Sequence, residues 1–320
     1  MENLTLRSKV NVEKHLLHNV KTATYTHGSQ SRRQQAIYSK SKEVYRQQIQ
    51  QFLKYREKQG FAKNVRIEKA VEQARGYIEH LRQCGRSENS INTTISALAK
   101  GLNVEQGMIG HADRSALSTR GREKEGYRNA TNERICHFAE MVGIRASEYE
   151  KLSGRHLLER DGRLWVIVER GKGGKYQEQL ISREHEQEVR TYFAGKDADE
   201  RLFSREEINS SKHCNLHGLR RENAQRAYKE YVREFQNPEA RERAKDALEA
   251  MFKRNPAKAG RFKREMMERP YIVRKAELRE ELRENGISED GRLDRLAVMA
   301  TAVFNLSHYR EGVVVLNYLR

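Results

Sequence analysis

The chain is poor in the residues that mark several common protein classes. Its 320 residues include only three prolines, one tryptophan and three cysteines. Cys84, Cys136 and Cys214 lie far apart and form no Cys-x-x-Cys pair, so we expect ordinary reduced thiols and no disulfide framework. The eleven histidines form no His-Glu-x-x-His motif, and none has cysteine partners at zinc spacing. The sequence therefore predicts no metal site.

Long apolar runs are missing as well. No segment approaches the roughly 20 apolar residues that cross a bilayer, and the mean hydropathy is -0.94. Residues 1–17 (MENLTLRSKVNVEKHLL) are too polar for a secretory signal. No P-loop and no cluster of carboxylates for a metal is visible, which predicts chemistry without a cofactor. We therefore expect a cytoplasmic protein that does not enter a membrane.

Positive charge is what the chain has in excess. Lys and Arg number 62 against 45 Asp and Glu, which leaves a formal net charge of +17 and a pI near 9.8. Such an excess indicates a polyanionic partner, with nucleic acid as the first choice and an anionic membrane surface as the second. Charge alone gives affinity without sequence preference.

The first third of the chain has the pattern of a helical bundle. Residues 1–30 are polar and weakly patterned, which predicts an N-terminal arm. Apolar residues then recur at helical spacing over 39–58 and 65–83, and a third helix is expected to start near Ser90. Gly101 is expected to end this third helix, because glycine is common just past helix ends.

Two domains are expected from these patterns. Residues 31–115 predict a helical domain with many basic residues on its outer faces. Residues 116–130 are polar, charged and interrupted by glycine, which is typical of a linker. Residues 131–320 then form the second domain.

Within the second domain the hydrophobic pattern changes from helix to strand and back. Segments 156–160, 163–170 and 175–182 predict three short strands, and Asp161-Gly162 is a typical two-residue hairpin turn. They predict an antiparallel meander. Helices are expected at about 132–142, 183–193, 216–235, 293–304 and 313–318.

The segment 236–291 differs from its surroundings. It holds all three prolines, Pro238, Pro256 and Pro270, among dense Arg, Lys and Glu. This composition predicts several short charged helices.

Seven polar residues of the second domain form an ordered set that could do chemistry. Alone, each has an ordinary explanation, such as a surface ion pair, a hairpin turn or a packed aromatic ring. Together they supply a hydroxyl nucleophile and several cations that could hold a phosphate, as arginine does through two parallel hydrogen bonds. In chain order they are Arg145, Glu148, Lys172, His217, Arg220, His308 and Tyr318.

The order and local context of these residues resemble the motifs of the tyrosine recombinase (phage integrase) family. The resemblance covers about 130–320 and, more weakly, 39–110. It implies a mainly α fold with a small antiparallel β-meander, in which 31–115 is a core-binding domain and 131–320 a catalytic domain. The motifs stand here as Arg145-Ala146-Ser147-Glu148, Gly171-Lys172-Gly173, His217-Gly218-Leu219-Arg220, Leu306-Ser307-His308 and Tyr318.

The resemblance implies a site-specific DNA recombinase or integrase of a mobile element. Such an enzyme cleaves and rejoins DNA strands through a 3′-phosphotyrosyl intermediate, which stores the energy of the broken bond and needs no cofactor. Its partners would be double-stranded DNA and three further protomers, as a homotetramer on paired DNA sites. It would be cytoplasmic and associated with the nucleoid.

The family also implies a role for each member of the set. Tyr318 would attack the phosphate, His217 would accept or orient its proton, and Lys172 would protonate the leaving 5′-oxygen. The remaining three cationic or hydrogen-bonding groups would stabilise the charge on the phosphate, and the carboxylate would hold an arginine or histidine in place. These are Arg145, Arg220 and His308, with Glu148 as the supporting residue.

Three features depart from the family pattern. Ser307 stands where glycine is usual, and the spacing from His308 to Tyr318 is one residue longer than the common one, which leaves Tyr309 as a rival nucleophile. The interval between Arg220 and His308 is long, so 236–291 is predicted to be an insertion. Because little chain follows Tyr318, this insertion or the 1–30 arm is expected to make subunit contacts, unless the insertion simply grips DNA.

Two other functions fit the same residues. A type IB topoisomerase uses a similar set to relax supercoiled DNA, although its larger size and different N-terminal half disfavour it. A DNA-binding protein with a decayed site is the other alternative, which the full set of residues disfavours. No motif specifies the target sequence, the direction of the reaction or an accessory factor.

Overall fold

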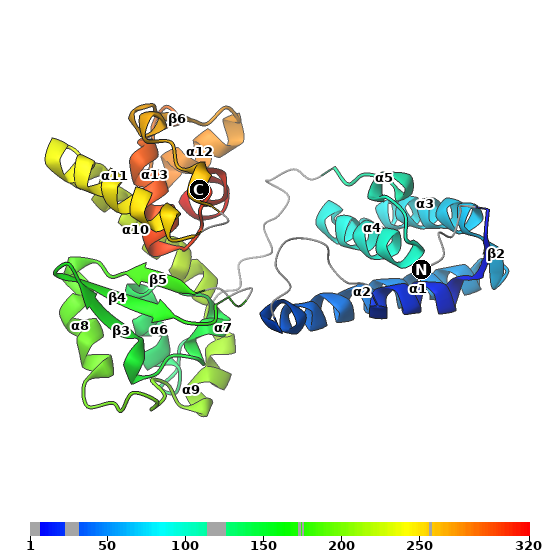
Figure 1. The fold of residues 1–320 in the computed structure, drawn as a ribbon, viewed down its shortest axis with the longest axis horizontal. Helices are drawn as coiled ribbons and strands as arrows, with labels where there is room; N and C mark the ends of the chain where they lie inside the picture. The colour runs from blue at the N-terminus through cyan, green and yellow to red at the C-terminus, as the bar shows by residue number, and fades with distance from the viewer. Residues whose placement is uncertain (1–6, 23–31, 114–125, 172–173, 175, 256–257) are drawn as a thin grey trace. The chain divides into compact units, whose positions relative to one another are not determined.

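The computed structural model describes residues 7–22, 32–113, 126–171, 174, 176–255 and 258–320. The chain folds as two compact units, Met1–Arg120 and Gly121–Arg320 (Figure 1). It is mainly helical, and the described residues form small antiparallel sheets. Most of the predicted linker 116–130 lies outside the described residues. Over the described ranges, we find no helix with the length and apolar character that crossing a membrane requires.

The first unit is a helical bundle with one small two-stranded sheet. Strands β1 and β2 pair antiparallel, with Val10 opposite Val65. The long helix α2 covers the predicted helix at 39–58 and begins earlier. The elements are β1 (Lys9–Asn11), α1 (Val12–Thr22), α2 (Arg32–Lys58), β2 (Asn64–Arg66), α3 (Ile67–Gln83), α4 (Glu88–Leu102) and α5 (Gln106–Ile109).

The predicted N-terminal arm at 1–30 is wrong for residues 9–22, which form β1 and α1. Val12, Leu16 and Val20 are spaced four residues apart, so they lie on one face of the helix, and all three are buried in the core of the first unit. The short apolar stripe was too sparse to stand out from the charged residues around it.

The ends of α4 also differ from the prediction. Its N-cap is Ser87, whose hydroxyl accepts a hydrogen bond from the Ser90 backbone N–H. Gly101 lies inside the helix, where a Cβ atom would come 2.6 Å from Leu16 Cδ2. Glycine is therefore needed there for close packing, and Asn103, with a φ of 56°, ends the helix instead.

The second unit combines a three-stranded sheet with two groups of helices. Helices α6 and α8 pack with the sheet around one core, and α10 to α14 share another. The elements are α6 (Glu133–Met141), α7 (Ala146–Tyr149), β3 (Leu157–Arg160), β4 (Arg163–Val168), β5 (Gln177–Leu180), α8 (Arg183–Phe193), α9 (Arg205–Ser210), α10 (Leu216–Glu234), α11 (Pro238–Lys253), β6 (Tyr271–Ile272), α12 (Ala276–Glu284), β7 (Arg292–Leu293), α13 (Arg295–Ala300) and α14 (Glu311–Val314). π-Helical turns extend α13 over Thr301–Asn305 and α14 over Val315–Leu319.

The predicted antiparallel meander is confirmed. The sheet order is β3-β4-β5, and Trp165 of β4 lies opposite Leu158 on one side and Leu180 on the other. Asp161 and Gly162 have φ values of 53° and 63°, as the predicted two-residue hairpin turn requires.

The segment 236–291 is part of the core of the second unit. Its main helix, α11, has 16 residues, so the prediction of only short helices is wrong. Leu248 and Phe252 of α11, with Leu278 and Leu282 of α12, are buried in the same cluster as α13 and α14. The high charge density of the sequence hid this apolar face.

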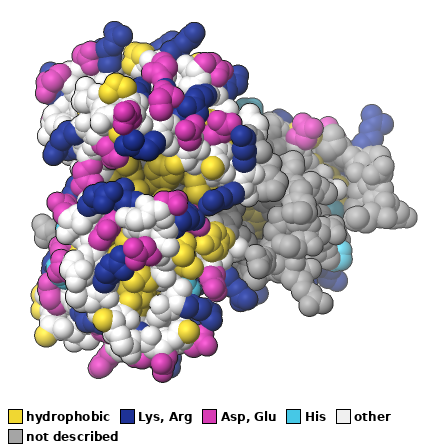
Figure 2. Space-filling view, turned by 60° about the vertical axis from the view of Figure 1, so that its left-hand side comes forward, with side chains coloured by type: hydrophobic (Ala, Val, Ile, Leu, Met, Phe, Trp, Pro, Cys, Tyr) yellow, Lys and Arg dark blue, Asp and Glu magenta, His cyan; other side chains and the backbone are white. Residues whose placement is uncertain are grey.

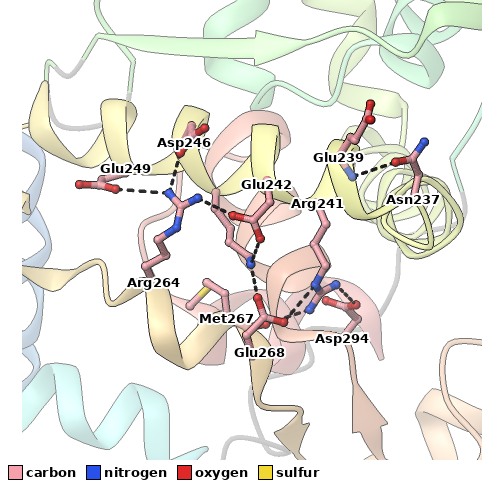
Figure 3. Close-up of polar contacts among 11 residues, drawn as sticks. Asn237, Glu239, Arg241, Glu242, Asp246, Glu249, Arg264, Met267, Glu268 and Asp294 are labelled. Atoms are coloured by element: carbon pink, nitrogen blue, oxygen red, sulfur yellow. Dashed lines mark hydrogen bonds and ion pairs between the residues drawn. The ribbon is translucent and has the colours of Figure 1, made fainter.

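Ion pairs hold the outer part of this segment together (Figure 3). Arg241 on α11 bonds Asp294 Oδ2 at 2.7 Å and lies 3.3 Å from Glu268 Oε2. Lys245, whose side chain is 6% exposed, pairs with Glu242 and Glu268. Because Asp294 is the N-cap of α13, these bonds tie α11 to the start of that helix.

Cys136 on α6 and Cys214 just before α10 form a disulfide across a sequence separation of 78 residues. The expectation of reduced thiols is therefore wrong for this pair. The spacing of the cysteines gave no sign of it, because the fold brings α6 beside the start of α10. Cys84 in the first unit is free and exposed.

Candidate active site

Arg220 lies near the start of α10 and is 1% exposed. Its guanidinium donates to the backbone carbonyl of Gly143 and to that of Leu306, the latter at 2.9 Å. Its remaining nitrogen, Nε, lies 3.4 Å from the hydroxyl of Tyr318. The side chain therefore joins the end of α6, the loop before α14 and the last helix of the chain.

Arg145 lies at the start of α7, and its side chain is 20% exposed. Nη1 donates to Glu148 Oε1 at 3.0 Å and to Gln177 Oε1 at 2.6 Å. Nη2 lies 3.4 Å from His308 Nε2. Two fixed acceptors thus hold one side of the guanidinium, and the other side faces the imidazole.

The hydroxyl of Tyr318 lies close to both a guanidinium and an imidazole. It is 3.5 Å from His308 Nε2 as well as 3.4 Å from Arg220 Nε. The ring of His217 packs edge-on against the Tyr318 ring, with centroids 5.8 Å apart. The structure therefore brings together every predicted catalytic residue that it describes, and Glu148 lies among them.

Lys172 is the predicted catalytic residue that lies outside the described residues. In the sequence it lies between β4 and β5.

The charges of the site are tuned by burial and by neighbouring groups. Burial lowers the pKa of the Arg220 guanidinium, and the positive charge of Arg145 lowers it further. Arginine nevertheless keeps its charge in proteins. Burial alone would raise the pKa of Glu148, but hydrogen bonds from the Arg145 backbone and Gln177, together with the Arg145 charge, lower it below its usual value. Glu148 is therefore a carboxylate that offsets part of the positive charge.

Tyr309 has a different environment from Tyr318. Its ring packs edge-on against Phe252 of α11, with centroids 5.0 Å apart, and its hydroxyl bonds Asn255. Burial raises the pKa of its phenol, which disfavours the phenolate. Tyr309 thus packs the loop onto the segment 236–291, while the Tyr318 hydroxyl faces Arg220 and His308.

Ser307 has a φ of 51°, a conformation in which glycine is favoured. Its hydroxyl donates to the Glu178 carbonyl at 3.1 Å and accepts from Gln179 Nε2 at 3.2 Å. These two bonds fix the residue next to His308, and they show how a serine is held in this position.

Several positioning groups were not predicted from the sequence. Gln177 and Gln179 lie in β5, for which the sequence predicted a strand but no role for either side chain. Gly171 was attributed to a hairpin turn, but a Cβ atom there would lie 1.4 Å from Gln177 Nε2 and 2.9 Å from Glu148 Oε1. Asn215 caps α10 by accepting from the Gly218 N–H at 2.9 Å, and an Asn before a helix was a signal that could have found it.

A cavity of about 330 Å³ lies between the sheet and α10–α11. Figure 2 shows it as a hollow with apolar side chains at its base and charged side chains of both signs around it. Its lining includes Trp165, Phe235 and Met251, and none of the predicted site residues that the structure describes. It is therefore separate from the candidate active site.

Chemically, the candidate site offers two guanidiniums, two imidazoles and a phenol within one small region. Such a group can bind a phosphate anion and present a hydroxyl nucleophile to it. Among the described residues, no three His, Cys, Asp or Glu side chains are grouped so that they could hold a metal ion.

No protein-family model matches the chain, and a comparison with curated proteins finds no match.

Proposed function

We propose that the protein is a DNA strand transferase of the tyrosine recombinase type. The observation that carries the proposal is the contact of the Tyr318 hydroxyl with Arg220 Nε and His308 Nε2, at 3.4 and 3.5 Å. Tyr318 is buried, and a buried phenol usually finds hydrogen-bond partners; here both partners are groups that could also donate to a phosphate. The net charge of +17 supports a nucleic acid as the substrate.

In the proposed reaction, Tyr318 Oη attacks a DNA phosphate. The new bond joins Oη to phosphorus, and the bond from phosphorus to the 5′-oxygen breaks. Arg145, Arg220 and His308 would donate to the non-bridging oxygens, where negative charge develops. The product is a 3′-phosphotyrosyl ester and a free 5′-hydroxyl, and the reverse attack by a 5′-hydroxyl rejoins a strand.

Two protons move in this step. Phenols carry their proton at neutral pH, so a tyrosine nucleophile must lose that proton as it attacks. His217, whose ring packs on the Tyr318 ring, would accept or orient that proton. The leaving 5′-oxygen needs a proton, and Lys172 would supply it.

The proposed enzyme would act as an assembly. Recombination joins two duplexes, so we expect a homotetramer on paired sites, in the setting of a mobile element and associated with the nucleoid. In this proposal the first unit is the core-binding domain and the second unit the catalytic domain. This part rests on the resemblance of the motifs alone.

The decisive experiment is covalent trapping on DNA. The probe is a random-sequence duplex library in which one linkage carries a 5′-bridging sulfur, so that the expelled thiol does not rejoin the strand. We expect an adduct that survives denaturing detergent and whose modified peptide contains Tyr318. Sequencing the trapped DNA would then give the target site.

Matched variants test the assignment of each role. Tyr318→Phe should abolish the adduct and Tyr309→Phe should keep it. Lys172→Ala should lose activity on ordinary DNA and regain it on the sulfur linkage, because a thiolate leaves without a proton. An adduct that persists in Tyr318→Phe would contradict the proposal, and its absence from every library would indicate a DNA-binding protein without chemistry.

A relaxation assay separates the nearest alternative. If the protein relaxes a supercoiled plasmid but exchanges no DNA between two copies of the site found by trapping, it is a type IB topoisomerase. Exchange of flanking DNA between two copies of the trapped site would identify a recombinase.

A further inference from the structure

Strand β5 carries two glutamines that reach two different parts of the candidate active site. Gln177 is 4% exposed, and its amide bridges Arg145 and Glu148. Its Oε1 accepts from Arg145 Nη1 at 2.6 Å, while its Nε2 donates to Glu148 Oε1 at 2.7 Å. Both ends of the amide are thus used, which fixes its orientation.

Gln179 is 1% exposed and lies two residues along the same strand. Its Nε2 donates to the Ser307 hydroxyl at 3.2 Å, next to His308. Two further bonds attach the same loop to the backbone of the strand. Ser307 donates to the Glu178 carbonyl at 3.1 Å, and Asn305 Nδ2 donates to the Leu180 carbonyl at 3.2 Å.

Residues two apart on a strand point to the same side of the sheet. Gln177 and Gln179 therefore stand about 7 Å apart on one rigid element. One of them holds Arg145, and the other holds the residue before His308. The two residues held in this way lie next to each other, since Arg145 Nη2 is 3.4 Å from His308 Nε2.

We propose that Gln177 and Gln179 are positioning residues that set the placement of Arg145 and His308 around the phosphate. This inference rests on the proposed function for its chemical consequence. Neither glutamine contacts the reacting atoms. Each acts by removing the freedom of a group that does, and an error of about 1 Å in such a group can reduce a rate about 100-fold.

Close packing supports a positioning role for Gln177. Gly171 lies so near its amide that a Cβ atom at Gly171 would come 1.4 Å from Nε2. The amide is therefore enclosed by the turn after β4 on one side and by Glu148 on the other.

The test replaces each glutamine by methionine, which keeps the length of the side chain and removes its hydrogen bonds. Single-turnover trapping on the sulfur-containing duplex, at saturating protein, would separate the rate of attack from DNA affinity. We expect Gln177→Met to slow the attack about 10- to 100-fold, with Gln179→Met slowed less and with unchanged affinity. Both variants should also melt at a lower temperature, because each loses buried hydrogen bonds.

A matched control comes from the first unit. Gln73 is 7% exposed and accepts from Arg56 Nε at 2.9 Å, so it is another buried glutamine that holds an arginine. Gln73→Met should leave the rate of attack unchanged. Wild-type rates in both Gln177→Met and Gln179→Met would overturn the inference, as would equal slowing in all three variants.

A spectroscopic readout decides the inference even if no DNA is trapped. In protein labelled with ¹⁵N-histidine, the His308 resonance is assigned with His308→Gln. We expect it to shift in Gln177→Met and Gln179→Met and to stay in place in Gln73→Met. If the wild-type protein traps no DNA, the proposed function fails. An unshifted His308 resonance in both variants would then refute the positioning as well.

Discussion

Arg220 and Tyr318 are 98 residues apart in sequence, yet Nε of the first lies 3.4 Å from the hydroxyl of the second within one chain. A single protomer therefore holds both the proposed nucleophile and a cation of its phosphate site. This relationship makes a prediction about which subunit cleaves DNA.

We expect cleavage in cis. Mixing Tyr318→Phe with Arg145→Gln protomers should give no adduct, because neither chain holds both the nucleophile and the full phosphate site. The two proteins should differ in size by a fused tag, so that gel mobility identifies the modified chain. An adduct on the Arg145→Gln chain would show that the tyrosine acts in trans.

The two arginines should differ in what they contribute. Arg220→Ala leaves two buried carbonyls without their donor, at a cost of about 1–3 kcal/mol each, so stability and activity should fall together. Arg145→Lys keeps a positive charge beside the buried Glu148 but loses the planar fork that would hold a phosphate, so it should reduce trapping about 10²- to 10³-fold with little loss of stability. Urea unfolding beside the trapping assay checks this, and equal stability of the two variants would contradict it.

Acid should weaken the protein partly through Glu148, whose pKa in the folded state is lowered. Because the folded state holds this carboxylate ionised, the charge of Glu148 stabilises the fold at any pH above about 4.3, the ordinary pKa of a glutamate. The stabilisation is lost as the pH falls below that value and the carboxylate becomes protonated. Glu148→Gln should therefore melt at a lower temperature than wild type at pH 7, with a gap that closes toward pH 3. The exposed Glu206→Gln should show no gap, and a constant gap for Glu148→Gln would refute the charge effect.

Ser307 offers a test of backbone strain. Ser307→Gly and Ser307→Ala both lose the hydroxyl, but only alanine keeps a Cβ atom at a φ of 51°. The alanine variant should be less stable than the glycine variant by about 1 kcal/mol. Ser210 has a φ of -69°, so there the alanine variant should be more stable than the glycine variant. Chemical denaturation of the four variants would measure both differences.

The disulfide should contribute to stability through the unfolded chain. Closing a separation of 78 residues is worth about 4.5 kcal/mol in the chain-entropy account. Reductant should therefore lower the melting temperature of the wild type and leave a Cys136→Ser/Cys214→Ser variant unchanged. Cys84→Ser should respond to reductant as the wild type does. A melting temperature that does not depend on reductant would contradict the bond.

Local patterns in the sequence predicted the local structure well. The helix expected at 183–193 is α8, and the Asp161-Gly162 turn is where the sheet reverses. What failed depended on contacts between distant segments. Leu16 packs against Gly101, and Cys136 meets Cys214, and no short-range pattern predicts such pairs.

In the candidate site, too, the sequence predicted some residues and missed others. Motifs with a fixed order pointed to Arg145, Arg220, His308 and Tyr318, and these residues lie together in the structure. Gln177 was missed because an amide in a short strand has no chemical signature of its own. Its role depends on which side of β5 faces Arg145, and the sequence does not reveal that.

The segment 236–291 shares its core with α13 and α14, which limits the deletions that this protein can tolerate. Excising the segment would strip α13 and α14 of their apolar neighbours, so the truncated chain would collapse whatever the segment does in the intact protein. Its contribution is accessible only through substitutions on its outer surface. Helices α11 and α12 are therefore as hard to remove as the helices that they pack against.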